Sequence, residues 1–228
     1  MSDKVLVSWS GGKDSAYALH EFVRANGCEI AALLTTVNAG FDRISMHGVR
    51  RSLLQSQAES LGYPLEEILI PRQCTDEEYE QLMGTVLQKY SKLGISGVVF
   101  GDLFLEDVRN YREERLGRIG MKAIFPIWGM DTAEQAQAFI DRGFRAIVVC
   151  VDTEVLDSDY VGREYDGQFL ADLPTSIDPC GENGEFHNFV YDCPLFSWSI
   201  KLKRGEKVLR EGRFYYCDLV PIRHKEPQ

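Results

Sequence analysis

An α/β fold, with a doubly wound parallel sheet followed by a smaller mixed α+β C-terminal region, is the architecture that this 228-residue sequence predicts. Over the first two-thirds of the chain, apolar runs alternate with helical patterns, which is typical of an open sheet wound by helices. Several runs are continuously apolar, as expected for strands covered on both faces. After Asp152 the pattern changes to short strand-like pieces joined by turns, which predicts a separate, smaller region.

Strands and helices are expected to alternate in the first part. The predicted strands are Val5–Trp9, Ile30–Val37, Leu65–Ile70, Val98–Phe100, Ile124–Trp128 and Ile147–Val151. The helix after the first strand is expected to bury Ala16, Leu19, Phe22 and Val23 and to end at Asn26-Gly27. A later helix is expected to begin near Asp131-Thr132, to bury Ala136, Phe139 and Ile140, and to end at Gly143.

The clearest helical pattern lies between the third and fourth predicted strands. Its apolar side chains recur at spacings of three and four residues and are Tyr79, Leu82, Met83, Val86, Leu87 and Tyr90. Thr75 and Glu78 precede them with the spacing of a capping box, in which each side chain bonds the backbone of the other residue. Gly94 is the predicted end of this helix.

The C-terminal region is expected to contain three short strands, Phe186–Tyr191, Ile200–Lys203 and Phe214–Val220, with a turn at Arg204-Gly205-Glu206. A polar stretch, 157–162, and a loop with Pro174, Pro179 and Gly181 precede them. The boundary falls between about 129 and 157, and we divide the chain into residues 1–130 and residues 131–228.

Composition and charge exclude several classes of protein. A net charge of −10 disfavours binding of nucleic acid through its phosphates. No apolar run is long enough to span a membrane, and the N-terminus does not have the pattern of a signal peptide, so a cytoplasmic protein is expected. The six cysteines form no Cys-x-x-Cys pair, which predicts reduced thiols without disulfides or a thiolate metal site.

The strongest functional signal is the string Ser10-Gly11-Gly12-Lys13-Asp14-Ser15, which follows a predicted strand and opens a helix. The two glycines permit a tight turn and a close approach of the backbone to a ligand. Amides of the turn and of the helix N-terminus suit an anion, and the lysine and serines add a charge and hydroxyl donors. The string therefore predicts a polyphosphate site, although it is not a Walker loop, since Asp14 follows the lysine. The alternative is an ordinary Gly-Gly turn.

This string resembles the PP-loop of the ATP pyrophosphatases. The resemblance implies that ATP is the cofactor and is split into AMP and pyrophosphate. It assigns ATP binding to residues 10–15 and implies that Lys13 and Asp14 take part in catalysis. It also agrees with the doubly wound sheet that the strand and helix pattern predicts.

A second string runs from Asp178 through Glu185-Phe-His187-Asn188 to Asp192, followed by Pro194-Leu-Phe196. It resembles the C-terminal signature of the diphthine–ammonia ligase family. Gly101-Asp102, at the end of the fourth predicted strand, and Arg109 and Arg112 on the next helix are also similar to that family. The likeness covers essentially the whole chain. Asn188 stands where a threonine is common in the family, and Cys193 where a glycine is common.

The resemblance implies an ATP-dependent carbon–nitrogen ligase that adenylates a carboxylate and then transfers ammonia to it. The acceptor is expected to be modified elongation factor 2 or a small molecule, and a homodimer is left open. Thr35 and Thr36, at the end of the second predicted strand and beside the first, are expected near the adenosine. Gly101 and Asp102 are also expected to bind ATP. Asp14 or Asp102 is the expected ligand of Mg²⁺ on the phosphates.

The acidic segment of the second string is the expected acceptor site. Glu182, Asn183 and Glu185 are expected to bind the substrate, with Glu185 and His187 as catalytic groups that handle ammonia or its proton. In an extended segment Glu185 and His187 would point to one face. The alternative is a solvated acidic turn. A lone histidine is more often structural than catalytic, so His47 is left outside the site.

Three other functions stay open. One is a PP-loop enzyme that adds sulfur or lysine to tRNA, which the negative charge and the absence of cysteine pairs disfavour. Another is a ligase that amidates a small-molecule carboxylate such as a corrinoid side chain. The third is a module that senses ATP without turning it over. Release of pyrophosphate that depends on acceptor and ammonia separates an enzyme from a sensor.

Overall fold

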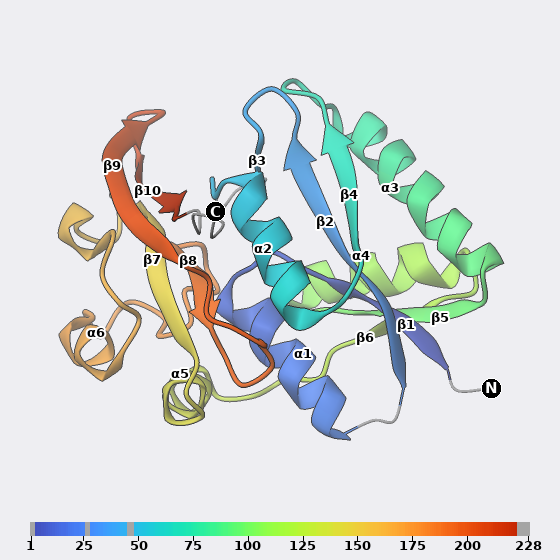
Figure 1. Cartoon of the computed structure of the whole chain (residues 1–228), viewed down its shortest axis with the longest axis horizontal. Helices are drawn as coiled ribbons and strands as arrows, with labels where there is room; N and C mark the ends of the chain where they lie inside the picture. The colour runs from blue at the N-terminus through green and yellow to red at the C-terminus, as the bar shows by residue number, and fades with distance from the viewer. Residues whose placement is uncertain (1–2, 26–27, 45–47, 223–228) are drawn as a thin grey trace, which may run out of the picture. The chain divides into compact units, whose positions relative to one another are not determined.

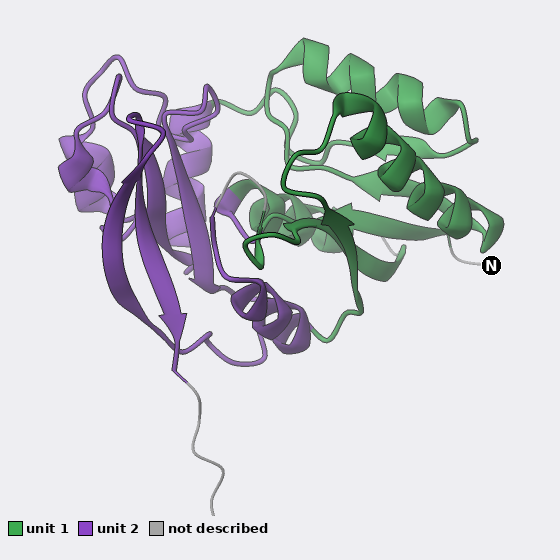
Figure 2. Cartoon of the chain, turned by 90° about the horizontal axis from the view of Figure 1, so that it is seen from above, with its two compact units in different colours: residues 1–10, 14–45, 62–131 green, residues 11–13, 46–61, 132–228 purple. Residues whose placement is uncertain are grey.

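The computed structural model describes residues 3–25, 28–44 and 48–222, which form two compact units (Figures 1 and 2). The first unit contains residues 1–10, 14–45 and 62–131, and the second contains residues 11–13, 46–61 and 132–228. Two early segments of the chain, 11–13 and 46–61, therefore belong with the C-terminal residues. That residues 1–130 bind ATP and residues 131–228 bind the acceptor stays a prediction. Asn26-Gly27, the predicted end of the first helix, and His47 lie outside the described residues.

The first unit is built on a parallel sheet. Its strands are β1 (Lys4–Ser8), β2 (Glu29–Asn38), β3 (Arg43–Ile44), β4 (Leu65–Ile70), β5 (Ile95–Val99) and β6 (Lys122–Ile124). β1 lies between β2 and β5, β2 also pairs with β4, and β5 with β6, all in parallel. Only the two-residue β3 runs antiparallel, beside the end of β2. The predicted doubly wound α/β sheet is confirmed.

The chain adds strands first on one side of β1 and then on the other, so the strand order reverses between β1 and β5. From β1 the chain moves outward through β2 to β4, then crosses back to β5 and continues to β6. The helices of this unit are α1 (Lys13–Ala25), α3 (Asp76–Lys92) and α4 (Glu106–Gly117). Because parallel crossovers are right-handed, opposite directions of travel place α1 on one face of the sheet and α3 and α4 on the other. A crevice is expected at the carboxyl ends of β1 and β5, where the order reverses.

Apolar side chains of α3 and α4 close one face of the sheet. Leu87 of α3 and Leu116 of α4 share a buried cluster with Leu6, Leu34 and Val98 of the strands. The predicted capping box of α3 is present, since the Thr75 side chain accepts from the Glu78 amide and the Glu78 side chain accepts from the Thr75 amide. The helix ends at Lys92, two residues before Gly94.

Two sequence expectations about this unit are wrong in detail. The strand expected at 124–128 is β6, which ends at Ile124, because Phe125 to Trp128 form a turn in which Pro126 has no amide for a strand ladder. Val23 was expected in the core but is 39% exposed, because it lies in the last turn of α1, near the end of the helix.

The second unit is built on an antiparallel sheet. Its strands are β7 (Arg145–Asp152), β8 (Phe186–Asp192), β9 (Leu202–Arg210) and β10 (Phe214–Pro221), in the order β8-β7-β10-β9. Its helices are α2 (Arg51–Leu61), α5 (Thr132–Asp141), α6 (Gly167–Asp172) and the short 3₁₀ turn η1 (Ser158–Tyr160). Ring contacts among Tyr165, Phe169 and Phe186 form part of its core.

A turn was expected at residues 204–206, but β9 runs through them. The ladder of β9 and β10 shifts register between Cys217 and Leu219, opposite this segment. A Cβ at Gly205 would lie 3.2 Å from the carbonyl oxygen of Asp218, so the glycine allows the two backbones to approach. The glycine therefore marks a bulge and not a turn. The turn of this hairpin lies at Glu211 and Gly212, both with positive φ.

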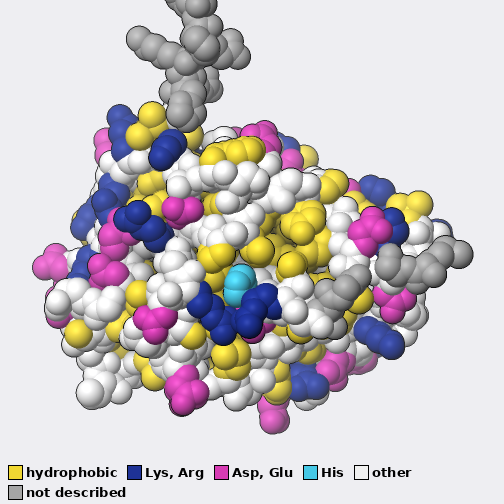
Figure 3. Space-filling view, turned by 60° about the horizontal axis from the view of Figure 1, so that its bottom comes forward, with side chains coloured by type: hydrophobic (Ala, Val, Ile, Leu, Met, Phe, Trp, Pro, Cys, Tyr) yellow, Lys and Arg dark blue, Asp and Glu magenta, His cyan; other side chains and the backbone are white. Residues whose placement is uncertain are grey.

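The surface carries charges of both signs. Figure 3 shows one face on which acidic and basic side chains are interspersed with apolar ones. All six cysteines are free thiols, and four of them are buried. No helix in the described parts of the chain is both long enough and apolar enough to cross a membrane.

Candidate functional site

Residues of the predicted phosphate loop that belong to the first unit lie directly after β1. The Trp9 amide donates to the Leu34 carbonyl at 2.8 Å, which continues the pairing of β1 with β2 by one residue. The hydroxyl oxygens of Ser10 and Ser15 are 3.2 Å apart, one before and one after the loop. Ser10 and Ser15, predicted together from the sequence, are therefore brought together.

Gly101, directly after β5, touches the start of α1. A Cβ at Gly101 would lie 2.6 Å from the carbonyl carbon of Asp14 and 2.8 Å from the amide nitrogen of Ser15. Real Cβ atoms do not approach backbone this closely, so this position requires glycine. The segments after β1 and β5 therefore meet at the point where the strand order reverses, as the sequence predicts for residues of one site.

Asp102 is a buried carboxylate with a basic partner. The Arg112 guanidinium donates from Nη2 to Oδ1 at 3.0 Å, and its Nε lies 2.8 Å from Oδ2. Burial nevertheless raises the pKa of Asp102 above its usual value, and the negative charge of Asp14 adds to that increase. The two carboxylates predicted to bind Mg²⁺ are therefore close enough to interact.

The pair Asp14 and Asp102 fits a magnesium ion brought by a nucleotide. Among the described residues, no group of three or more acidic, histidine or cysteine side chains could hold a metal without other ligands. Mg²⁺ in nucleotide sites is usually held by one or two carboxylates, with phosphate oxygens and water completing its shell. Two neighbouring carboxylates at this sheet edge suit that arrangement, although Asp102 also forms an ion pair with Arg112.

Thr35 and Thr36 lie on β2, just beyond the residue that pairs with the end of β1. Leu34 is the partner of Ser8, and the two threonines continue β2 past that pair while facing Glu67 and Ile68 of β4. Thr35 is buried and Thr36 half-buried. They lie within the strand, which continues to Asn38, and the predicted contact with adenosine stays a prediction.

In the second unit, the phosphate-loop residue Gly11 is held by two other elements. Its carbonyl oxygen accepts the Val190 amide of β8 at 2.9 Å and the side-chain amide of Gln57, on α2, at 3.1 Å. Gly11 has φ +77°, and a Cβ there would lie 2.6 Å from Leu54 and 2.7 Å from Gln57. Both the backbone conformation and the close packing therefore require glycine.

Lys13, the first residue of α1, is held from β8 as well. Its amide donates to the Asn188 side-chain oxygen at 2.8 Å, so a residue 175 positions away caps the N-terminus of the helix. The Lys13 side chain is only 2% exposed. A buried ammonium group needs negative groups around it that compensate its charge.

His187 lies beside Lys13 in the same unit. Burial of the ring and, to a lesser degree, the positive charge of Lys13 lower the pKa of His187 from 6.5 to about 4. The ring is therefore neutral at pH 7. Lys13, His187 and Asn188, which are far apart in the sequence, are brought together.

The Glu185 carboxylate accepts hydrogen bonds from the loop that precedes it in the chain. This carboxylate accepts the amides of Asp178 and Asn183 at 3.2 and 3.0 Å, and the Asn183 side chain at 3.0 Å. Glu185 is 7% exposed, so the alternative of a solvated turn does not describe it, whereas Asn183 is exposed and Glu182 half-buried. The Glu182 amide bonds Asp178, which closes the loop. Glu185 and His187 therefore have different partners.

Two residues were missed as parts of the site. Gln57 was not selected from the sequence, and Asn188 was noted only as a departure from a family pattern. A signal for Gln57 existed, because it follows Leu53 and Leu54 at helical spacing and so lies on the buried face of α2. A buried glutamine needs hydrogen-bond partners, which the sequence cannot name. For Asn188 no local signal exists.

Fold and loop together define a class: a doubly wound α/β protein with a glycine-rich loop after the strand at which its strand order reverses, and with a second, antiparallel-sheet unit. The sequence matches the family model described as the diphthamide synthase N-terminal domain over residues 3–123, and the one described as the diphthamide synthase C-terminal domain over residues 131–220. The chain belongs to the diphthamide synthase family.

Relatives with the name diphthine–ammonia ligase are 26–28% identical to this chain over the aligned residues. The one from Bos taurus is 28% identical over 222 residues, covering 87% of this chain and 82% of the relative. The one from Schizosaccharomyces pombe is 27% identical over 226 residues, covering 90% of this chain and 37% of the relative. A crystal structure titled as a predicted subunit of tRNA methyltransferase from Methanocaldococcus jannaschii is 16% identical, with a TM-score of 0.39 and coverage of 80% and 89%.

Proposed function

We propose that this protein is an ATP-dependent ligase that activates a carboxylate as its adenylate and converts it to an amide with ammonia. The observation that carries the proposal is the loop 10–15. Its Gly11 carbonyl and Lys13 amide are held from β8, and its lysine is buried at the start of a helix. Such a loop presents positive charge and amide groups to a polyphosphate before the nucleotide arrives.

The loop acts in the first step. The acceptor carboxylate attacks the α-phosphorus of ATP, the bond to the bridging oxygen breaks, and pyrophosphate leaves with the electron pair. Lys13 and the N-terminus of α1 stabilise the negative charge that develops on the leaving group. When bound, Mg²⁺ would neutralise further phosphate charge, with Asp14 and Asp102 as the residues that hold it. Thr35 and Thr36 are the proposed neighbours of the adenosine.

His187 acts in the second step. Ammonia attacks the acyl carbon, AMP leaves, and the nitrogen must lose a proton to become a neutral amide. The negative charge of phosphate bound next to Lys13 would raise the lowered pKa of His187, so that the imidazole can take that proton. Glu185 orders the loop 178–185 through its three hydrogen bonds, and Glu182 and Asn183 of that loop are the proposed contacts to the acceptor.

The name of the relatives supports the choice of substrates. A diphthine–ammonia ligase joins ammonia to diphthine, and the family membership of this chain supports the same type of reaction. We therefore propose ammonia as the nitrogen donor and a diphthine-like carboxylate as the acceptor. Another carboxylate acceptor would react by the same chemistry, so the experiment below tests a second acceptor as well.

The test is a product analysis. The purified chain is incubated with ATP, ¹⁵N-ammonium and either an elongation factor 2 that carries diphthine or a corrinoid carboxylate. Nucleotides are separated by chromatography, and the acceptor is weighed by mass spectrometry. We expect AMP and pyrophosphate, together with ¹⁵N in the acceptor that supports turnover. ADP as the main product would contradict the proposal, and so would AMP without incorporated nitrogen.

Lys13→Ala is the matched loss-of-function variant. It removes the positive charge of the loop and should abolish formation of AMP, because the leaving pyrophosphate loses its fixed counter-charge. Lys4→Ala is the control, since Lys4 is an exposed lysine of β1 paired with Glu29. We expect Lys4→Ala to retain wild-type turnover, and equal activity of both variants would show that the loop is not the phosphate site.

A further inference from the structure

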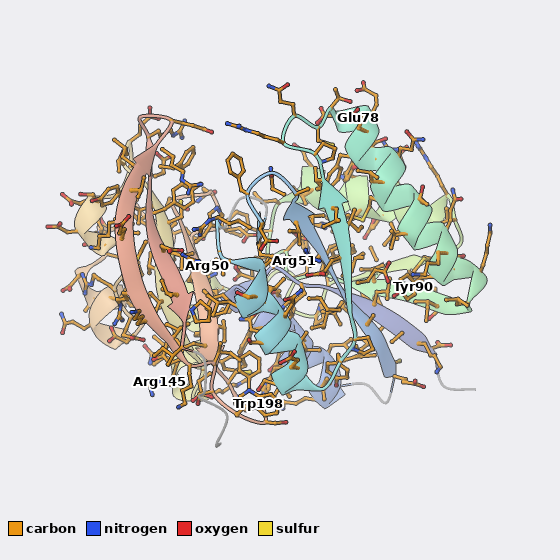
Figure 4. All side chains as sticks on the ribbon, turned by 45° about the horizontal axis from the view of Figure 1, so that its top comes forward. Arg50, Arg51, Glu78, Tyr90, Arg145 and Trp198 are labelled. Atoms are coloured by element: carbon orange, nitrogen blue, oxygen red, sulfur yellow. The ribbon has the colours of Figure 1, made fainter. Side chains whose placement is uncertain are left out.

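One side-chain amide joins the phosphate loop to the strand that carries His187. Gln57 of α2 is fully buried, and its Nε2 donates to the Gly11 carbonyl at 3.1 Å and to the Val190 carbonyl at 2.6 Å. Val190 in turn donates its own amide to the Gly11 carbonyl at 2.9 Å. Both protons of one amide group are therefore used, and the Gly11 oxygen accepts from two donors. Figure 4 labels Arg50 and Arg51, where α2 begins.

The direction of the Gly11 carbonyl matters for an anion. A carbonyl oxygen repels phosphate, whereas an amide attracts it. In a trans peptide the carbonyl and the following amide point in opposite directions, so holding the Gly11 oxygen toward β8 and α2 keeps it away from the other side of the loop. The amide of the same peptide unit, that of Gly12, then points to that other side.

A peptide between two glycines does not hold one orientation by itself. Gly11 and Gly12 lack Cβ atoms, so steric hindrance to rotation of this peptide is small. The backbone of β8 supplies one donor to the Gly11 oxygen, and Gln57 supplies the second. The side-chain amide of Gln57 also donates to the Val190 carbonyl, and this second hydrogen bond fixes the position of that amide against β8.

We infer that Gln57 is a positioning residue for ATP: it keeps the Gly11 carbonyl turned away from the polyphosphate, so that the loop offers amides and not oxygens to the anion. The inference rests on the proposed function and adds a specific residue to it. Gln57 itself need not touch the nucleotide, because it acts through the peptide that it holds.

The same helix offers a matched control. Ser60, also fully buried on α2, donates to the Trp198 carbonyl at 2.6 Å and accepts the Trp198 amide at 3.1 Å. Trp198 is labelled in Figure 4. Ser60→Ala therefore removes two hydrogen bonds of α2, both to Trp198, whereas Gln57→Leu removes one to the phosphate loop and one to Val190.

The experiment measures three ligands by calorimetry: ATP, inorganic pyrophosphate and adenosine. For Gln57→Leu we expect the affinities for ATP and pyrophosphate to fall roughly tenfold, the usual effect of one lost hydrogen bond. The affinity for adenosine, which has no phosphate, should stay unchanged. Ser60→Ala should keep all three affinities, although its thermal stability should fall by a similar amount. This separates positioning of the loop from general stability.

Several results would overturn the inference. An unchanged pyrophosphate affinity in Gln57→Leu would do so, as would an equal loss in Ser60→Ala or a parallel loss of adenosine binding. Should Gln57→Leu fail to fold, Gln57→Asn takes its place, since the shorter amide cannot reach both carbonyls. Failure of both variants to fold would assign Gln57 to stability alone. A wild-type chain that binds neither ATP nor pyrophosphate would instead refute the proposed function.

Discussion

Acidification should destabilise this protein through His187. In the native chain the pKa of His187 is lowered to about 4, because the ring is buried and lies beside the Lys13 charge, whereas in the unfolded chain it returns to about 6.5. Above pH 6.5 the ring is neutral in both states. Between pH 6.5 and 4 the unfolded chain binds a proton that the native chain does not, so the free energy of unfolding falls as the pH falls.

The size of the effect follows from the pKa. One pKa unit corresponds to about 1.4 kcal/mol, so the full change is about 3 kcal/mol. His187 as a residue is half-buried, so screening by solvent reduces the change to about 1–3 kcal/mol. Urea unfolding of the wild type and of His187→Gln at pH 7, 6, 5 and 4 isolates this contribution, because glutamine does not titrate. The wild type should lose that much more stability than the variant.

Two outcomes would refute this reasoning. Parallel curves of stability against pH in the wild type and His187→Gln would show that the histidine titrates alike in both states. An NMR titration that gives His187 a pKa near 6.5 would show the same directly. Addition of ATP extends the test, because phosphate charge next to Lys13 should raise the pKa of His187 and cause uptake of a proton on binding.

Two further predictions concern the loops that flank the site. Glu185→Gln replaces a carboxylate that accepts three hydrogen bonds, so unfolding in urea should show a loss of about 1–3 kcal/mol, and an unchanged midpoint would mean that the loop 178–185 does not depend on it. Gly101→Ala forces a Cβ within 2.6–2.8 Å of the backbone of Asp14 and Ser15, so the start of α1 must shift and ATP affinity should fall at least about tenfold. Gly117→Ala, in a position with open space, is the control and should bind ATP as the wild type does.

Local patterns in the sequence were sufficient for much of the fold. Continuously apolar runs identified most strands of the parallel sheet, because strands covered on both faces need apolar side chains on both. The run 147–151 belongs instead to β7 of the antiparallel sheet, which is also buried, so this pattern shows burial and not strand direction. The capping box of Thr75 and Glu78 was readable because both partners lie within one helical turn. The same holds for the loop 10–15, whose glycines, lysine and position between strand and helix are all local features. The turn predicted at Gly205 was wrong because the local sequence does not separate a turn from a bulge, both of which a glycine permits.

Tertiary structure alone decided how the loop is held. Asn188 caps Lys13 across 175 residues, and Gln57 reaches Val190 across 133, so no local pattern could reveal either bond. It also decided that Glu185 is buried against its own loop, and that residues 11–13 and 46–61 belong with the C-terminal unit. The sequence by itself determines which chemical groups are present and which elements they begin or end, because these depend on neighbours in the chain. The partner of a buried polar group depends on which distant backbone the packing brings within hydrogen-bond distance.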